Sequence, residues 1–315
     1  MTQNRQKVWI DSDGGVDDAL ALMCAIRSAR LDLAGVSTVF GNVAPRKAAR
    51  NMALVQSLAG GVVVPVHTGC AQPLQGSWRH ARHIHGEDGI GGASAGHALG
   101  YEEGVVRDRG ADAALAAMAG FARGGGTLIA LGPLTNLART LSRAPDTLDG
   151  INEIIVMGGA LSVPWVRRGG VEFNTGSDLE SARGVLAMAP RLTLIPLDIC
   201  RRVVLRRARL AQMVRGLPER AGRFLVRAHE HYMNAYRASD GIEGCYPHDA
   251  LAVMAAASPE VFRFETLPLE FATDGEFPGL LRTAPAGRPV RVATGVDQRA
   301  ALNAIAIALG GHSSD

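Results

Sequence analysis

The sequence of 315 residues is poor in aromatic side chains, poor in cysteine and without a long apolar run. Aromatic residues make up 5% of the chain, and 33 basic residues nearly balance 30 acidic ones, so the net charge is +3. Nucleic-acid surfaces usually combine clustered basic residues with stacking side chains, and this composition therefore argues against a nucleic-acid partner. The densest basic run, Arg201 to Arg209, is interpreted as a solvated helix face.

The cysteines Cys24, Cys70, Cys200 and Cys245 are scattered along the chain, and none lies in a CxxC pair. They therefore predict no disulfide framework. The polar N-terminus, MTQNRQK, leads directly into the first apolar stretch. No apolar segment approaches the roughly 18 residues that a membrane span needs. We therefore expect a cytoplasmic protein with no signal peptide and no membrane partner.

Short β-branched stretches alternate with helix-forming stretches along most of the chain. Strands are expected at 8–10, 31–40, 62–66, 127–131, 153–157 and 192–197, and helices at 16–30, 45–58, 111–123, 135–143, 178–188, 249–257 and 297–309. Alternation of this kind predicts an α/β fold with a doubly wound, mostly parallel central sheet and helices on both faces. No repeat or linker is visible, so residues 1–315 are expected to form a single domain.

The segment 68–110 lacks periodicity and carries the histidines His80, His83, His85 and His97. A loop of this length inside a compact domain is usually functional or mobile. His83 and His85 could form an HxH zinc pair, but no nearby cysteine or suitably spaced third histidine supports it. We expect His80 and His97 to lie on the surface.

The stretch KVWIDSDGGVDDALAL places Asp11, Asp13, Asp17 and Asp18 within eight residues, at a predicted junction of strand and helix. Two like charges about 4 Å apart repel by roughly 4 kcal/mol at an effective dielectric near 20. The cluster is therefore unfavourable unless a cation lies inside it, and a metal ion is the simplest candidate. The alternative is that Asp13 caps the helix while Asp17 and Asp18 complement its dipole.

Three further polar motifs follow predicted strands or open late helices. They are LGPLTN at 131–136, EFN at 172–174 and HD at 248–249. Together with the acidic turn they resemble the inosine-uridine preferring nucleoside hydrolase family, from Lys7 to Leu309. The family signature DxDxGxDDAxA reads here as DSDGGVDDALA, and the further agreements are VFGN at 39–42, IHGEDG at 84–89, MGG at 157–159 and CYPHDALA at 245–252.

The resemblance implies an enzyme of nucleoside metabolism that hydrolyses the N-glycosidic bond of ribonucleosides to ribose and free base, with a Ca²⁺-bound water as nucleophile. It implies that Asp13, Asp18, Asp249 and the main-chain carbonyl of Leu131 hold the Ca²⁺, an all-oxygen set suited to a hard cation. Asp13 would also accept a proton from the attacking water. Family members are typically homodimers or homotetramers, so a homo-oligomer is expected.

The resemblance also implies which residues bind the substrate. The sugar would be bound by Asp17, Asn42, Glu172 and Asn174, and Asp11 would orient the other carboxylates. His248 would protonate the leaving base. His85 would lie near the base, as in pyrimidine-preferring or mixed-specificity members, and the loops 68–110 and 220–245 would select among inosine, uridine, cytidine and nicotinate riboside.

The sequence departs from the family pattern at two places. Gly14 stands where the family usually has proline, a change expected to loosen the turn. The segment PWVRRGG at 164–170 replaces a Gly-Asn pair that normally contacts the 5′-hydroxyl, and Arg167 or Arg168 could take over that contact.

Two other functions remain as alternatives. The DSDG turn also resembles the nucleophile loop of haloacid-dehalogenase-type phosphatases, but the late acidic candidate for Mg²⁺, TDGE at 273–276, lacks the usual spacing. A non-catalytic calcium-dependent nucleoside binder would be expected to lack Asp13 or His248, and both are present.

Overall fold

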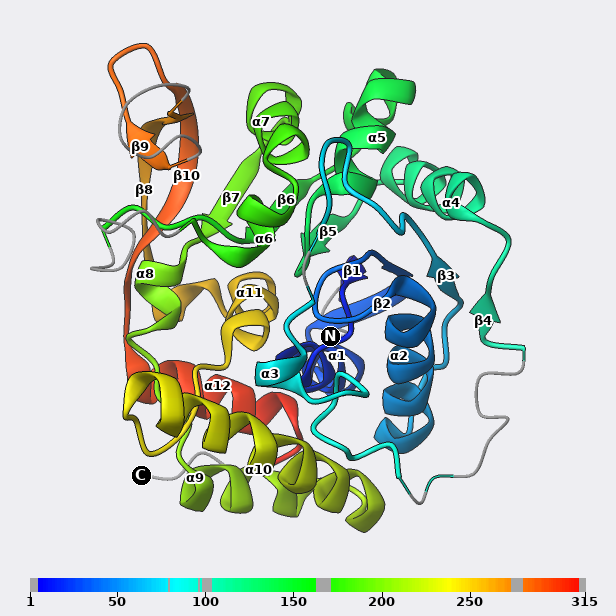
Figure 1. The fold of residues 1–315 in the computed structure, drawn as a ribbon, viewed down its shortest axis with the longest axis vertical. Helices are drawn as coiled ribbons and strands as arrows, with labels where there is room; N and C mark the ends of the chain where they lie inside the picture. Colours follow the sequence, from blue (N-terminus) through cyan, green and yellow to red (C-terminus); the bar gives the residue numbers. More distant parts are fainter. Residues whose placement is uncertain are drawn as a thin grey trace.

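The computed structural model describes residues 5–78, 80–95, 97, 104–162, 171–272 and 280–311. Within these ranges ten strands form one sheet in the order β4-β3-β2-β1-β5-β6-β7-β10-β8-β9 (Figure 1). The strands are β1 (Gln6–Ser12), β2 (Leu31–Thr38), β3 (Val66–Thr68), β4 (Val106–Arg107), β5 (Thr127–Ala130), β6 (Glu153–Met157), β7 (Leu192–Ile195), β8 (Phe262–Phe271), β9 (Leu281–Thr283) and β10 (Arg288–Val296).

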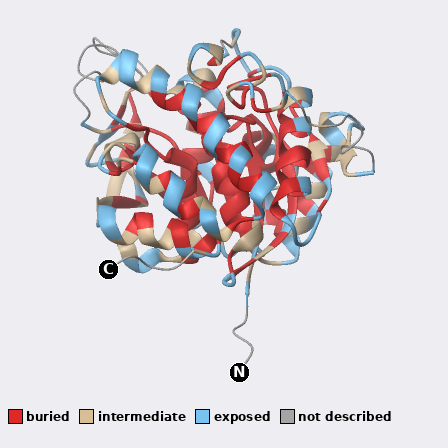
Figure 2. Ribbon diagram, turned by 90° about the horizontal axis from the view of Figure 1, so that it is seen from below, coloured by how far each residue is buried: buried red, intermediate tan, exposed pale blue. Residues whose placement is uncertain are grey.

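Helices cover both faces of this sheet. They are α1 (Val16–Arg27), α2 (Pro45–Ala59), α3 (Arg82–His85), α4 (Ala111–Arg123), α5 (Thr135–Arg143), α6 (Phe173–Ser177), α7 (Leu179–Met188), α8 (Leu197–Cys200), α9 (Arg207–Met213), α10 (Glu219–Asp240), α11 (His248–Ala257) and α12 (Gln298–Ala308). Side chains of α1, α2, α10, α11 and α12 form one core with the sheet, while α4, α5 and α7 form a second core on the opposite face. Figure 2 shows the resulting helices with buried inner sides and exposed outer sides.

Neighbouring residues of one strand supply these two cores, as the two-residue period of a strand requires. In β1, Ile10 packs into the core beneath α1, whereas Trp9 packs into the opposite core. The seven strands β1 to β7 and the strand β10 run parallel to their neighbours among them. The strand β8 is antiparallel to β10, and β9 is antiparallel to β8. The predicted α/β fold with a mostly parallel sheet is therefore confirmed.

The strand order reverses at the centre of the sheet, between β1 and β5. After β1 the chain builds β2, β3 and β4 on one side, and it then returns to place β5 on the other side of β1. The loops that leave β1 and β5 consequently diverge and open a crevice at the carboxyl ends of the strands, the usual ligand position in such sheets. Asp13 and Leu131 follow these two strands directly.

Most predicted elements form within one or two residues of their expected bounds, and 111–123, 135–143 and 153–157 coincide with α4, α5 and β6. The strand expected at 62–66 is wrong. The strand β3 begins only at Val66, which pairs with Val36, and Val62 and Val63 are 61% and 53% exposed. β-branched residues favour extended structure anywhere, so they did not locate the pairing with β2.

The helix α10, with 22 residues, buries one side against the core beneath α1. That side includes His229 and Tyr232, which are each 1% exposed. The His229 Nδ1–H group donates a hydrogen bond of 2.8 Å to the carbonyl oxygen of Leu225. No helix in the described ranges is both long and apolar enough to span a bilayer.

We expect a His229→Gln substitution to reduce the sensitivity of the fold to acid. Burial lowers the pKa of His229 from 6.5 to about 4. The neutral histidine therefore contributes stability that is present above pH 6.5 and is lost as the pH falls toward 4. Between pH 7 and pH 5 the wild type should lose about 2 kcal/mol more unfolding free energy than the variant, at 1.36 kcal/mol per unit. Denaturant unfolding of both proteins at the two pH values measures these losses, and equal losses would contradict this assignment.

Candidate active site

The acidic turn joins β1 to α1 through two glycines. Gly14 has a φ of 78°, and a Cβ atom there would lie 2.5 Å from the Cα atom of Ala48. Proline fixes φ near −65°, so the residue that the family usually has at this position cannot adopt the same turn. The residue before α1 is Gly15. The alternative in which Asp13 caps this helix is therefore wrong.

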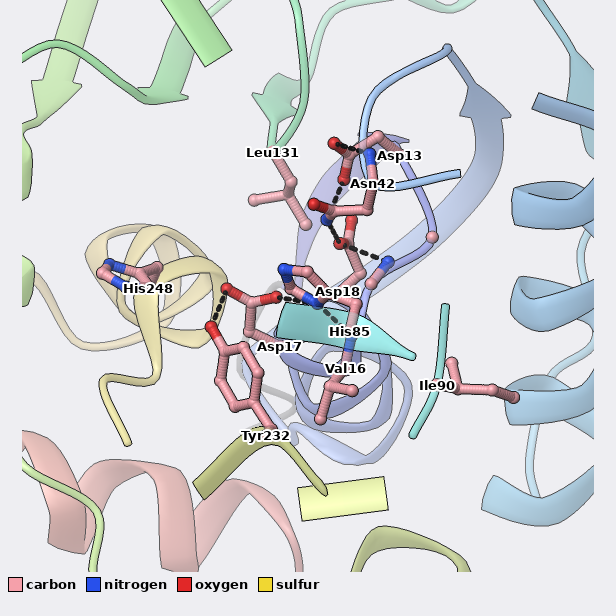
Figure 3. A network of polar contacts seen from close by, with 12 residues as sticks. Asp13, Val16, Asp17, Asp18, Asn42, His85, Ile90, Leu131, Tyr232 and His248 are labelled. Carbon is pink, nitrogen blue, oxygen red and sulfur yellow. Dashed lines mark hydrogen bonds and ion pairs between the residues drawn. The ribbon is translucent and has the colours of Figure 1, made fainter. Parts of the chain in front are cut away.

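Asp13 and Asp18 are fully buried and held by short hydrogen bonds. The backbone N–H of Asn42 and its side-chain amide donate to the two carboxylate oxygens of Asp13, at 2.9 and 2.7 Å (Figure 3). The Ser12 hydroxyl and the Gly15 N–H donate to Asp18, at 2.6 and 2.7 Å. The chain packs so closely here that a Cβ at Gly41 would lie 2.0 Å from an oxygen of Asp13.

Asp249 comes to this turn from the first turn of α11. Carboxylate oxygens of Asp17, Asp18 and Asp249 lie within 4.8 Å of one another, and all three residues are buried. The Tyr232 hydroxyl donates to Asp17 Oδ2 at 3.0 Å, while Asp17 Oδ1 is buried without a hydrogen bond. No lysine or arginine in the described part of the chain pairs with these carboxylates; the nearest basic group is His85, 3.7 Å from Asp17.

The electrostatics of this group show how unfavourable it is without a cation. Burial, and then the charge of Asp18, raise the pKa of Asp17 to about 7. Burial and the charges of Asp17 and Asp18 raise the pKa of Asp249 well above its usual range. Burial also raises the pKa of Asp13, with the adjacent Asp18 as the next cause. Asp18 thus lies beside both Asp13 and Asp249.

Asp11 precedes the acidic turn and lies near the end of β1. The Ser37 hydroxyl and the Asn136 amide donate to its Oδ1, at 2.6 and 2.8 Å, and its Oδ2 is buried without a hydrogen bond. Burial raises the pKa of Asp11 to about 6. The Asn136 side chain in turn accepts the Cys70 N–H at 2.9 Å, so Asp11 lies in a network that joins the loops after β1 and β3.

Leu131, Glu172 and Asn174 converge on the opposite side of the crevice. The Asn174 amide donates to the Leu131 carbonyl at 2.7 Å and to the Met157 carbonyl at 3.1 Å. Glu172 caps α6 by accepting the N–H groups of Asn174 and Thr175, at 2.9 and 3.0 Å. The side chain of Asn174 is therefore fixed against the Leu131 carbonyl.

Between these elements lies a cavity of about 320 Å³. Eight of the predicted site residues line it: Asp17, Asn42, His85, Leu131, Glu172, Asn174, His248 and Asp249. Asp13 and Asp18 are buried beside it. The cavity size falls near the lower end of small-molecule sites, about 300–1,000 Å³, so an occupant must contact the walls.

The two predicted histidines have different partners at the cavity. The Val16 N–H donates to His85 Nδ1 at 3.1 Å, so the proton of this ring is on Nε2. Burial lowers the pKa of His85 to about 3. The Tyr236 hydroxyl bonds His248 Nε2 at 2.8 Å, and His248 Nδ1 is buried without a partner. Burial and the charge of Arg201 lower the pKa of His248 to about 3, so both rings are neutral.

The remaining histidines do not belong to the candidate metal group of the described ranges, which contains carboxylates only. His83 is exposed and lines the cavity beside the buried His85, so these two residues do not form the alternative zinc pair. His80 is exposed as expected, and His97 is half-buried against Phe224 at 5.9 Å between ring centroids. The Arg167 and Arg168 pair and the motif at 273–276 lie outside the described residues.

Sequence reasoning missed three polar side chains of the cavity wall. Tyr232 and Tyr236 lie on one side of α10, and their four-residue spacing was the available signal. Arg201 was expected on a solvated helix face, and this interpretation is wrong because its side chain lines the cavity. The residue follows the short helix α8, so it is not part of a long exposed helix.

A parallel sheet with a buried carboxylate group and histidines at its switch point is typical of an α/β enzyme with a hard-cation site. Residues 8–303 match the model of the family described as inosine-uridine preferring nucleoside hydrolase, and the chain belongs to this family. It is therefore a nucleoside hydrolase, an enzyme that cleaves N-glycosyl bonds. This membership excludes the phosphatase interpretation of the DSDG turn.

Relatives and solved structures agree with this assignment over nearly the whole chain. The chain is 33% identical over 281 residues to the non-specific ribonucleoside hydrolase RihC of Escherichia coli O127:H6, covering 87% of this chain and 86% of that protein. A plant nucleoside hydrolase structure superposes with a TM-score of 0.85 at 27% identity, covering 98% of this chain and 99% of that one. A purine-preferring ribonucleoside hydrolase from Gardnerella vaginalis gives 0.84 at 27% identity, with coverages of 97% and 98%.

Proposed function

We propose that this nucleoside hydrolase acts on ribonucleosides, releasing ribose and free base, and that it uses one Ca²⁺ held by its buried carboxylates. The observation that carries the proposal is the buried group of Asp17, Asp18 and Asp249, of which Asp17 and Asp249 line a cavity that is also lined by His248. A single cavity thus holds both an acidic end and a histidine ring that can form a hydrogen bond with a leaving base.

The donor atoms fit a hard divalent cation. They are all oxygens, and the carboxylates of Asp18 and Asp249 belong to a buried group whose oxygens lie within 4.8 Å of one another. The proposed ligands are the carboxylates of Asp13, Asp18 and Asp249 together with the Leu131 carbonyl. That carbonyl accepts one hydrogen bond from Asn174, and its second lone pair remains for a metal ion.

Calcium bound there would supply a water activated for attack on the sugar, which N-glycosidic hydrolysis requires. Asp13 would take the proton of that water, and this role is supported by the two bonds from Asn42, which fix its carboxylate beside Asp18. Asp17 offers its unpartnered oxygen to a ribose hydroxyl, while Tyr232 fixes the other oxygen.

The other sugar contacts come from the cavity wall. Asn174 and Asn42 present side-chain amides there, and Glu172 Oε1 accepts only the Asn174 N–H in the described structure. Glu172 also fixes the backbone of α6, so it both lines the cavity and positions Asn174.

His248 serves the leaving base. The Tyr236 hydroxyl orients the ring through Nε2, and the unpartnered Nδ1 is the ring atom available to a bound base. A positioned proton donor typically accelerates such a step by about 10²–10⁴-fold. His85 lines the same cavity with its Nε2–H group and is a second donor toward the base.

The decisive experiment is a panel of inosine, uridine, cytidine and nicotinate riboside assayed for free ribose with and without a chelator. We expect ribose from at least one substrate, loss of activity with the chelator and recovery with added Ca²⁺. Calcium at about 100 times its Kd should also stabilise the fold by about 2.7 kcal/mol. Nucleoside binding without ribose release would favour the non-catalytic binder instead, and full activity in chelator would contradict the role of calcium.

From the family resemblance we further propose that the enzyme is a homodimer or homotetramer and works in the cytoplasm in purine and pyrimidine salvage. Light scattering coupled to gel filtration measures the assembly, and a monomer at working concentration would contradict it.

A further inference from the structure

Arg201 lies in the active-site cavity, although nothing in the proposed chemistry uses it. It follows α8 directly, at the end of the segment that leaves β7, and its side chain lines the cavity together with His248 and Tyr236. The side chain is 30% exposed. The next residue, Arg202, is exposed and its guanidinium contacts the carbonyl of Thr294 at 3.4 Å.

The position of Arg201 is fixed by two contacts. Its Nη2 atom pairs with Asp240 Oδ2 at 2.6 Å, and its guanidinium carbon lies 4.9 Å from the ring centroid of Tyr246. The Tyr246 ring lies 5.7 Å from His248 and 5.1 Å from Tyr236. The guanidinium of Arg201 therefore lies at the same end of the cavity as His248, and both side chains pack near the ring of Tyr246.

We infer that Arg201 is a specificity-determining residue that donates a hydrogen bond to an oxygen of the leaving base. This inference rests on the proposed function, because it takes the His248 end of the cavity as the base site. A guanidinium carries five N–H donors in a rigid fork and has no acceptor. The ion pair with Asp240 engages Nη2, so other donors of the fork can serve a ligand.

The pairing with Asp240 decides which oxygen is recognised. Asp240 neutralises the positive charge, so the pair as a whole offers little net attraction to an anionic base. A neutral exocyclic carbonyl fits such a donor, whereas an exocyclic amino group at the same position has no lone pair to offer it. The enzyme should therefore favour uridine over cytidine and inosine over adenosine, since the members of each pair differ in that exocyclic group and in the protonation of the ring nitrogen beside it.

The test measures kcat/KM for these four nucleosides in the wild type, Arg201→Met and the control Arg202→Met. We expect the wild type to favour the carbonyl-bearing member of each pair. The Arg201→Met variant should lower that preference by about 10–100-fold, the range for a lost hydrogen bond to a charged group. The Arg202→Met variant removes the neighbouring guanidinium, which lies outside the cavity, and should keep the wild-type ratios.

Three results would overturn the inference: a wild type that favours the amino-bearing members, unchanged ratios in Arg201→Met, or an equal loss on all four substrates. The last result would show that Arg201 only supports the fold. If Arg201→Met does not fold, Arg201→Lys keeps the pair with Asp240 but lacks the planar fork, and it should lower the ratios by at least about 3-fold. A wild type that hydrolyses none of the nucleosides would instead refute the proposed function, so the two failures are distinct.

Discussion

An Asp249→Asn substitution is expected to abolish tight calcium binding and ribonucleoside hydrolysis together. The substitution keeps the shape of a side chain that is 3% exposed and removes one charge from the buried group with Asp17 and Asp18. Loss of an anionic ligand weakens a hard-cation site, and loss of the cation removes several kcal/mol of catalysis. We expect kcat/KM to fall by at least about 10³-fold, at 1.36 kcal/mol per factor of ten.

Calorimetric calcium titration and ribose release measure the two losses, and thermal unfolding adds a readout that is independent of activity. Without calcium the variant should be at least as stable as the wild type, because one of the mutually repelling carboxylates is gone. With calcium the wild type should be the more stable protein, because it binds the cation more tightly. The exposed residue Asp149 offers a control, since Asp149→Asn should change neither quantity. Wild-type calcium affinity in Asp249→Asn would refute the proposed ligand set.

A His248→Ala substitution is expected to slow hydrolysis of inosine and uridine by about 10²–10⁴-fold while calcium affinity stays unchanged. The reason is that His248 lines the base end of the cavity with an unpartnered Nδ1 and does not belong to the carboxylate group. A riboside with a 4-nitrophenolate leaving group needs no proton as it departs. Its kcat should therefore fall by less than about 10-fold, which separates proton donation from general damage to the site.

Steady-state kinetics on both substrate types make this comparison, with His80→Ala as the matched control at an exposed histidine. Equal losses on the natural and the activated substrate would contradict the role of His248 as the acid. A simultaneous loss of calcium affinity would place His248 in the structure of the cation site instead.

The local sequence pattern was sufficient to predict the acidic turn and the helices α4 and α5. The acidic turn was predicted at a strand-to-helix junction, and it lies between β1 and α1. The helices α4 and α5 formed at their predicted residues, because the helical periodicity of buried and exposed residues is encoded within each segment. The proximity of Asp249 to Asp18 could not be predicted from a local pattern. It joins residues on α1 and α11, and no local pattern contains it, so only the family resemblance predicted it.

The parts that sequence reasoning missed depend on long-range packing. Arg201 belongs to a run of arginines, and its place in the cavity follows from Asp240 and Tyr246, which lie some forty residues later. Residue type alone favoured exposure. The start of β3 is set in the same way by pairing with β2, and the β-branched residues Val62 and Val63 carried no information on that pairing.

The last strand of the sheet, β10, is inserted between β7 and β8, both of which precede it along the chain. A growing polypeptide on the ribosome can therefore pair β8 with β9 but cannot attach them to the rest of the sheet until residues 288–296 have emerged. Until then β7 presents an open edge, the kind of surface on which unfinished chains associate. A delay before this segment becomes available should accordingly prolong the time during which that edge can associate with other chains.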